Sequence, residues 1–203
     1  MKDKNALFFD KSCDDHKDCG WAAALWSSEE DQIGRFILLT KIFNRAFVPE
    51  NFSVLDVGCG QGDLCGFLKN RGAECGYLGI DVSPKMIESA KNKYPDEDFI
   101  LSNFQTHDFG DYKFGYVICN GMFSLKINDQ LDVVKDCISK MYDLTDVAMS
   151  INFLSNKASN EQKFDQYFYY EPTDILKHCF KLTKSVNLKH SYCDHEFMVT
   201  LHK

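Results

Sequence analysis

The stretch Val54-Leu-Asp-Val-Gly-Cys-Gly-Gln-Gly62 decides the fold, because an apolar run around an acid passes directly into three glycines spaced two residues apart. The apolar run has the composition of a β-strand, and the residues after Gly62 have the pattern of a helix. A strand, a glycine turn and a helix in this order bring the backbone close to a nucleotide-like ligand. Glycine suits the turn because a Cβ would block the ligand and oppose a positive φ. The stretch therefore predicts a binding turn for such a ligand.

Around this turn, segments with strand composition alternate with helical patterns. We expect strands over residues 52–56, 75–80, 98–101, 116–119, 146–153, 182–190 and 196–202. We expect helices over residues 64–70, 84–93, 130–142 and 173–180, the last capped by Thr173. This alternation predicts an α/β fold with a doubly wound, mostly parallel, seven-stranded sheet and helices on both faces. The two last strands form a hairpin, so one closing strand is antiparallel.

The first 50 residues are expected to form a helical cap on this core. Residues 27–47 have a helical pattern that Ser27 or Ser28 can cap, with acids in the first turn. The apolar face of that helix is expected to carry Ile33, Phe36, Ile37, Thr40 and Phe43. No repeat or linker composition interrupts the chain. We therefore expect one domain over residues 1–203, with a cap over 1–50 and a Rossmann-like core over 51–203.

Composition and charge narrow the function classes. The 203 residues are 44% hydrophobic and 14% aromatic, which is enough for a sizeable core. The net charge is −7 and Lys and Arg do not cluster, so a nucleic-acid partner is not expected. No apolar run approaches the ~20 residues of a membrane span, and we expect a soluble, cytoplasmic protein without membrane contact. No sequence feature indicates an oligomeric state.

The nine cysteines predict free thiols. Their number is odd and they are scattered, so a disulfide framework is not expected. Several lie in apolar segments, where a thiol packs as a small hydrophobic group: Cys59, Cys65, Cys119, Cys137 and Cys179. The spacing of Cys13, His16 and Cys19 could begin a metal site, but a structural zinc needs four ligands and no partner pair lies nearby. We expect no metal and a mobile polar segment there.

Polar residues at the ends of the expected strands predict the ligand. Asp81 ends the second strand about 20 residues after the turn, the spacing expected of a carboxylate that binds both ribose hydroxyls. Alternatively, Asp81 caps the next helix. Asp56 either contacts the ligand or supports the turn. A dinucleotide site would need a glycine three residues after Gly60, but this position is Asp63, so NAD and FAD are disfavoured.

The pattern resembles the class I S-adenosylmethionine-dependent methyltransferase family in two motifs, residues 54–64 and 79–90, and the resemblance extends over roughly residues 52–203. It implies S-adenosylmethionine as methyl donor and S-adenosylhomocysteine as product. It places the methionine part on the turn and Asp81 on the ribose. Arg35 could pair with the methionine carboxylate or face solvent. The other residues that the resemblance implies for the donor are Asp56, Gly58, Cys59, Gly60, Val82, Met86, Asn103, Phe104, Asn120 and Trp26.

The sequence contains fewer signals for the residues that bind the acceptor than for those that bind the donor. Methyl transfer from a sulfonium is an in-line displacement that needs positioning and exclusion of water, with a base for many oxygen or nitrogen acceptors. His195 and His190 are the candidate bases, although either could be structural. An acceptor pocket is expected from residues that could also be ordinary core: Phe123, Asn152, Tyr169 and Tyr170.

The segment Asn120-Gly-Met-Phe123 bears on the class of acceptor. It lacks the Asn/Asp-Pro-Pro-aromatic pattern typical of family members that methylate nucleic-acid amino groups. Together with the acidic charge, this favours a small-molecule acceptor. The alternatives are a non-catalytic cofactor-binding or partner module, a protein or RNA methyltransferase, and thiol-dependent arsenic methylation.

Overall fold

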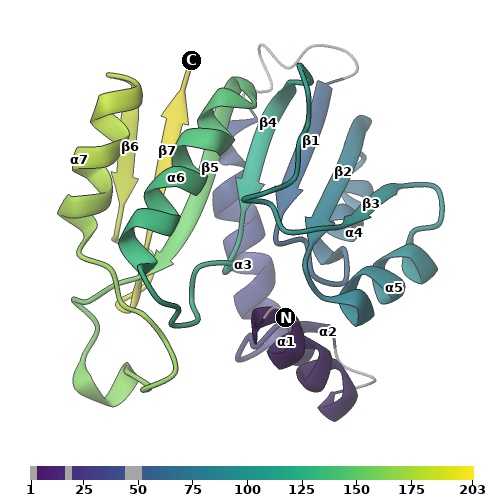
Figure 1. The fold of residues 1–203 in the computed structure, drawn as a ribbon, viewed down its shortest axis with the longest axis horizontal. Coiled ribbons are helices and arrows are strands. Elements are labelled where there is room, and N and C mark those ends of the chain that lie inside the picture. Colours follow the sequence, from purple (N-terminus) through teal and green to yellow (C-terminus); the bar gives the residue numbers. More distant parts are fainter. Residues whose placement is uncertain (1–3, 17–19, 44–51) are drawn as a thin grey trace.

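The computed structural model describes residues 4–16, 20–43 and 52–203, and its core is one seven-stranded sheet (Figure 1). The strand order is β3-β2-β1-β4-β5-β7-β6. The strands are β1 (Phe52–Val57), β2 (Cys75–Asp81), β3 (Asp98–Leu101), β4 (Phe114–Cys119), β5 (Thr145–Leu154), β6 (Val186–Lys189) and β7 (Glu196–His202). The helices are α1 (Lys4–Asp15), α2 (Gly20–Ala23), α3 (Glu29–Leu39), α4 (Asp63–Asn70), α5 (Pro84–Lys93), α6 (Gln130–Asp143) and α7 (Pro172–Leu182).

The direction of the strands confirms the predicted fold class. Neighbouring strands from β3 to β5 pair in parallel, whereas β7 is antiparallel to both β5 and β6. The carboxyl ends of β1, β2 and β4 therefore meet at one edge of the sheet, and α1 and α2 lie below that edge in Figure 1. A parallel sheet of this kind binds ligands beyond the carboxyl ends of its strands.

Two apolar layers pack on the two faces of the sheet. Because side chains alternate along a strand, Val54 of β1 faces α3, α4 and α5, while Leu55 and Val57 face α6 and α7. The same alternation divides Tyr116 from Val117 on β4. The five cysteines expected in the core are buried there. Within the described residues, no helix is long and apolar enough to cross a membrane.

Two predicted boundaries near the carboxyl terminus are wrong. Helix α7 is capped by Glu171, whose side chain accepts a hydrogen bond from the Thr173 backbone, and not by Thr173 itself. Pro172 occupies the first turn, where its fixed φ suits a helix. Because α7 continues to Leu182, the strand expected from that residue begins only at Val186.

The predicted face of α3 is also wrong in part. Ser28 caps the helix as expected, and Phe36 is buried. Ile33 and Ile37, however, are 36% and 38% exposed, while Gln32 and Arg35 are buried. The polar pair is buried because partners on α4 and β7 satisfy both side chains, as described below. The helix gives way to a short 3-10 turn over Thr40–Ile42, and the expected continuation to residue 47 lies outside the described residues.

The polar segment around Cys13 and Cys19, which we expected to be mobile, is helical from Cys13 to Asp15. Cys13 lies on the regular helix α1. Cys19, the other cysteine of that cluster, lies outside the described residues. Among residues 4–16, 20–43 and 52–203, no group of histidine, cysteine and acidic side chains could hold a metal ion.

Gly79 in β2 tests how tightly this strand packs against Phe99 of β3 and Cys59 of the glycine turn. A Cβ at this position would lie 2.7 Å from Phe99 Cδ1 and 2.8 Å from Cys59 Sγ, and both neighbours are buried. We expect Gly79→Ala to lower the free energy of unfolding by about 1–3 kcal/mol, measured by urea denaturation. Gly34→Ala in α3 is the control, because a Cβ there has nothing within 4 Å. That control should stabilise by about 0.5–1 kcal/mol. Equal effects of the two substitutions would contradict this packing.

Candidate functional site

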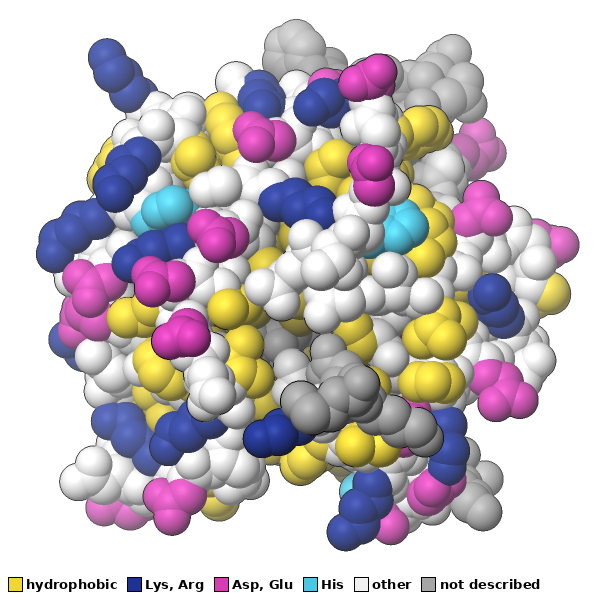
Figure 2. All heavy atoms as spheres, in the orientation of Figure 1, with side chains coloured by type: hydrophobic (Ala, Val, Ile, Leu, Met, Phe, Trp, Pro, Cys, Tyr) yellow, Lys and Arg dark blue, Asp and Glu magenta, His cyan; other side chains and the backbone are white. Residues whose placement is uncertain are grey.

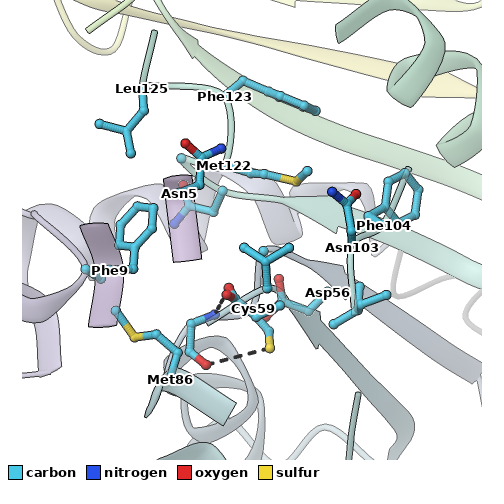
Figure 3. Close-up of a pocket in the computed structure, with 18 of the residues that line it drawn as sticks. Asn5, Phe9, Asp56, Cys59, Met86, Asn103, Phe104, Met122, Phe123 and Leu125 are labelled. Atoms are coloured by element: carbon cyan, nitrogen blue, oxygen red, sulfur yellow. Dashed lines mark hydrogen bonds between the residues drawn. The ribbon is translucent and has the colours of Figure 1, made fainter. Parts of the chain in front are cut away.

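A cavity of about 610 Å³ opens at the carboxyl ends of β1, β2 and β4 (Figure 3). Its floor is the glycine turn between β1 and α4, and one wall is the segment after β3. Helix α1 contributes Asn5 and Phe9 to the opposite side. Every cofactor residue expected from the sequence lines this cavity except Arg35.

The glycine turn has the backbone shape that its sequence predicts. Gly58, Gly60 and Gly62 have φ angles of 76°, 53° and 78°. The amides of Gly58 and Cys59 donate to the Ile80 carbonyl at 2.9 and 3.2 Å, which joins the turn to β2. A Cβ on Gly58 would lie 2.9 Å from Met122 Cβ. Both the positive φ and this close approach therefore require glycine at position 58.

Asp81 ties the turn to the end of β2. Its Oδ2 accepts the Gly60 amide at 3.0 Å, and its Oδ1 accepts the Ser83 amide at 2.9 Å. The alternative that Asp81 caps the following helix is wrong, because Ser83 is the cap and accepts the Met86 amide at 3.2 Å. Asp81 instead joins the backbones of two loops through its carboxylate. The same side chain lines the cavity.

Asp56 is a buried acid beneath the turn. It is 2% exposed and accepts a hydrogen bond from the Tyr77 hydroxyl at 2.5 Å. Burial raises the pKa of Asp56 to about 7, because an ionised carboxylate loses its hydration there. Burial also raises the pKa of Asp81. The bond from Tyr77 therefore joins β2 to Asp56 of β1 beneath the turn, and Asp56 also lines the cavity.

The wall after β3 is held in place from α6. The ammonium of Lys140 donates to the carbonyls of Phe104 and His107 at 2.7 and 2.6 Å. Asn103 Oδ1 accepts the Gln105 amide at 2.9 Å, which orders the turn at the cavity edge. The segment 103–107 thus presents Asn103 and Phe104 to the cavity from a backbone that a distant helix fixes.

Asn120, at the end of β4, carries an unsatisfied acceptor. Its Oδ1 is buried and has no hydrogen-bond partner in the described structure, although the side chain lines the cavity. A buried polar atom without a partner is costly, so such an atom in a cavity wall indicates a ligand group.

No sequence motif predicted that residues of α1 lie at the site. Asp10 of α1 accepts the Ser83 hydroxyl at 2.7 Å and the Lys85 amide at 3.2 Å. These bonds hold α1 on the amino-terminal end of α5, so that Phe9 faces the cavity. The apolar run from Ala6 to Phe9 did not identify the residue that faces the cavity, because Leu7 and Phe8 of the same run are exposed.

A second cavity of about 450 Å³ adjoins the first. Trp26, Gly121 and Leu125 line both cavities. Three of the predicted acceptor-side residues line the second cavity, namely Asn152, Tyr169 and His195, while Phe123 lines the first.

Three predicted site residues line neither cavity. Tyr170 is fully buried and donates to the Phe123 carbonyl at 2.9 Å, so it is a core residue as its alternative interpretation held. His190 Nε2 lies 2.7 Å from the Ser155 hydroxyl. Arg35 is buried, so the alternative that it faces solvent is wrong, while its pairing with the methionine carboxylate stays a prediction. Its guanidinium bonds Glu196 at 2.9 Å and Asp31 at 2.7 Å.

Comparison with known proteins agrees with this geometry. The family described as "Methyltransferase domain" matches residues 54–144, from β1 through α6. Putative methyltransferase Rv1506c of Mycobacterium tuberculosis is 29% identical over 157 residues, which are 75% of this chain and 93% of that protein. Putative methyltransferase 235L of Invertebrate iridescent virus 6 is 26% identical over 98 residues, and the match spans 48% of this chain but only 36% of that protein.

The fold has a close counterpart among solved structures. The magnesium protoporphyrin IX methyltransferase of Synechocystis PCC 6803, solved with bound S-adenosylhomocysteine, superposes with a TM-score of 0.71 at 15% identity. The superposition covers 98% of this chain and 97% of that chain. Together with the two sequence motifs, the glycine turn and Asp81 in one cavity, these matches show that residues 54–144 resemble the methyltransferase domain family and that the chain has the fold of the class I S-adenosylmethionine-dependent methyltransferases.

Proposed function

We propose that this methyltransferase acts on a small-molecule acceptor that binds in the second cavity while the donor occupies the first. The observation that carries the proposal is the contact between the two cavities at Trp26, Gly121 and Leu125. A donor and an acceptor in adjoining cavities can be brought together and partly shielded from water, and this is the main requirement of the reaction.

The residues of the first cavity fit the donor. Asp81 would bind the ribose hydroxyls with the lone pairs that its two backbone bonds leave free, and the turn at Gly58 would approach the methionine part. Val82 and Met86 would flank the adenine. The unsatisfied Asn120 Oδ1 supplies an acceptor for a donor N–H group. Bound S-adenosylmethionine would supply a methyl group on a positively charged sulfur, and the acids of the cavity floor favour that charge.

The shape and charge of the chain support a small acceptor. The second cavity has the size of a small-molecule pocket and is built mainly from side chains of the described core and cap. On the face shown in Figure 2, Lys and Arg side chains are interspersed with Asp and Glu. A nucleic-acid substrate would favour a continuous basic surface.

We also propose that residues 1–50 form one functional unit with the core. Phe9 and Trp26 of the amino-terminal segment line the cavities, and Arg35 bonds the first residue of β7. Removal of this segment would therefore open both cavities to solvent.

Substitution of Asp81 tests the donor site. We expect Asp81→Ala to weaken S-adenosylmethionine binding at least about tenfold in isothermal titration calorimetry, because a charged hydrogen-bond acceptor is lost. Asp98→Ala is the matched control, since Asp98 is exposed at the opposite end of β3 and should leave the affinity unchanged. Asp81→Asn, which keeps one carbonyl oxygen for the backbone, separates ligand binding from loop support. Full affinity in a folded Asp81→Ala protein would exclude the proposed role.

Substitution of Lys140 tests whether the wall at Asn103 must be held in place. Lys140→Met keeps the length of the side chain but removes the donor to three carbonyls. We expect about fivefold weaker donor binding, which corresponds to about 1 kcal/mol. Lys135→Met on the same helix is the control, because Lys135 makes only a 3.9 Å ion pair with the largely exposed Asp132. If both variants bind the donor equally well, the wall does not depend on Lys140.

The raised pKa of Asp56 predicts a pH-dependent stability of the ligand-free protein. Its folded-state pKa of about 7 lies above the ordinary value of 3.8, so the folded state retains a proton that the unfolded state has lost. This contribution to stability is full below the ordinary pKa and is lost as the pH rises to about 7. From about pH 5 to about pH 8, the wild type should lose on the order of 2 kcal/mol relative to Asp56→Asn. Parallel stability curves from urea denaturation would disprove this assignment.

A further inference from the structure

We propose that the second cavity selects an acceptor that arrives as a cationic amine on an aromatic or apolar body, and that nitrogen receives the methyl group. The inference rests on the proposed function and adds the substrate class. The charged side chains and aromatic rings that line the cavity support it. The sequence motifs do not describe these side chains.

The charged groups of the second cavity are acidic. Asp31, Glu161 and Glu196 line it, and no lysine or arginine does so among the described residues. The nearby Arg35 bonds both Asp31 and Glu196, so one guanidinium faces two carboxylates. Negative charge therefore remains in excess, and the exposed Glu161 adds to it. This field attracts a cation and repels a carboxylate.

Lys163, which lies in sequence between the lining residues Gln162 and Phe164, is occupied elsewhere. Lys163 donates to the Asn156 carbonyl at 2.8 Å, and its ammonium lies 5.9 Å from the centre of the Tyr169 ring. It does not line the cavity. An acceptor that needed a cationic partner for a carboxylate or phosphate would find none among the described lining residues.

Aromatic rings line the same cavity on several sides. They come from the cap, from β5 and from the segment between β5 and α7: Phe9, Trp26, Phe153, Phe164, Tyr167 and Tyr169. The Tyr169 hydroxyl donates to the Gln162 carbonyl at 3.1 Å and accepts the Phe164 amide at 2.9 Å. These bonds fix the ring before any ligand binds. Fixed aromatic faces bind apolar rings and attract cations to their faces.

One imidazole lines the cavity within the described part of the chain, that of His195. Its Nε2 lies 3.9 Å from Glu196 Oε1, and its Nδ1 lies 3.2 Å from Cys193 Sγ. A protonated amine has no lone pair, so it must lose a proton to His195 or to water before reaction. The nitrogen lone pair then forms the N–C bond as the C–S bond breaks, and the pair of that bond stays on sulfur.

The test compares two acceptor probes of matched size and opposite charge, phenethylamine and 3-phenylpropionate. Binding is measured by calorimetry on the full chain saturated with S-adenosylhomocysteine. The indole N–H resonance of Trp26, assigned with Trp26→Phe, reports whether each probe enters the cavity. We expect phenethylamine to bind at least about tenfold more tightly and to shift this resonance. With S-adenosylmethionine, mass spectrometry should find the methyl group on nitrogen.

Glu161→Gln provides a variant whose fold is not at risk, because the side chain is exposed. It should weaken phenethylamine binding about two- to fivefold, whereas Glu88→Gln on the exposed surface of α5 should have no effect. Equal or tighter binding of 3-phenylpropionate would overturn the inference. So would failure of phenethylamine to bind to protein that binds S-adenosylhomocysteine normally. Failure of the folded protein to bind S-adenosylhomocysteine would instead overturn the proposed function.

Discussion

The carboxylate of Asp81 is the interaction on which the site depends. One of its oxygens binds the Gly60 amide and the other binds the Ser83 amide, so a single side chain joins the turn after β1 to the loop after β2. Ser83 in turn caps α5 and donates to Asp10 of α1. The floor of the first cavity, the loop after β2 and helix α1 are therefore linked through a short chain of hydrogen bonds.

A second link joins the cap to the far end of the sheet. Arg35 of α3 bonds Glu196, the first residue of β7, and both side chains are buried. Asn152 of β5 also donates to Glu196, at 3.5 Å, and accepts the Gly121 amide at 2.8 Å. A buried ion pair of this kind contributes little net stability, but it permits only a narrow range of geometries. It thereby positions the cap against the strands that border the second cavity.

Most of the fold was predictable because its signals are local. The strand and helix patterns, the glycine turn and the Ser28 cap each depend on neighbouring residues, and the structure confirms them. The errors on the face of α3 occurred where a distant partner overrode the local pattern. Gln32 bonds Asp63, and Arg35 bonds Glu196, so polar residues are buried and Ile33 faces solvent.

The sequence by itself determined the fold class and predicted the residues that line the first cavity, because two short motifs on adjacent parallel strands must meet at one edge of the sheet. Only the tertiary structure determined which residues line the second cavity. Its lining joins Trp26 of the cap, Gly121 after β4, Tyr169 before α7 and His195 before β7, which are far apart in the chain. No local sequence pattern predicts that these side chains lie together, because tertiary packing, and not periodicity, brings them into contact with one cavity. The tertiary structure also distinguished the two candidate bases. His195 lines the cavity, whereas His190 is bonded to Ser155.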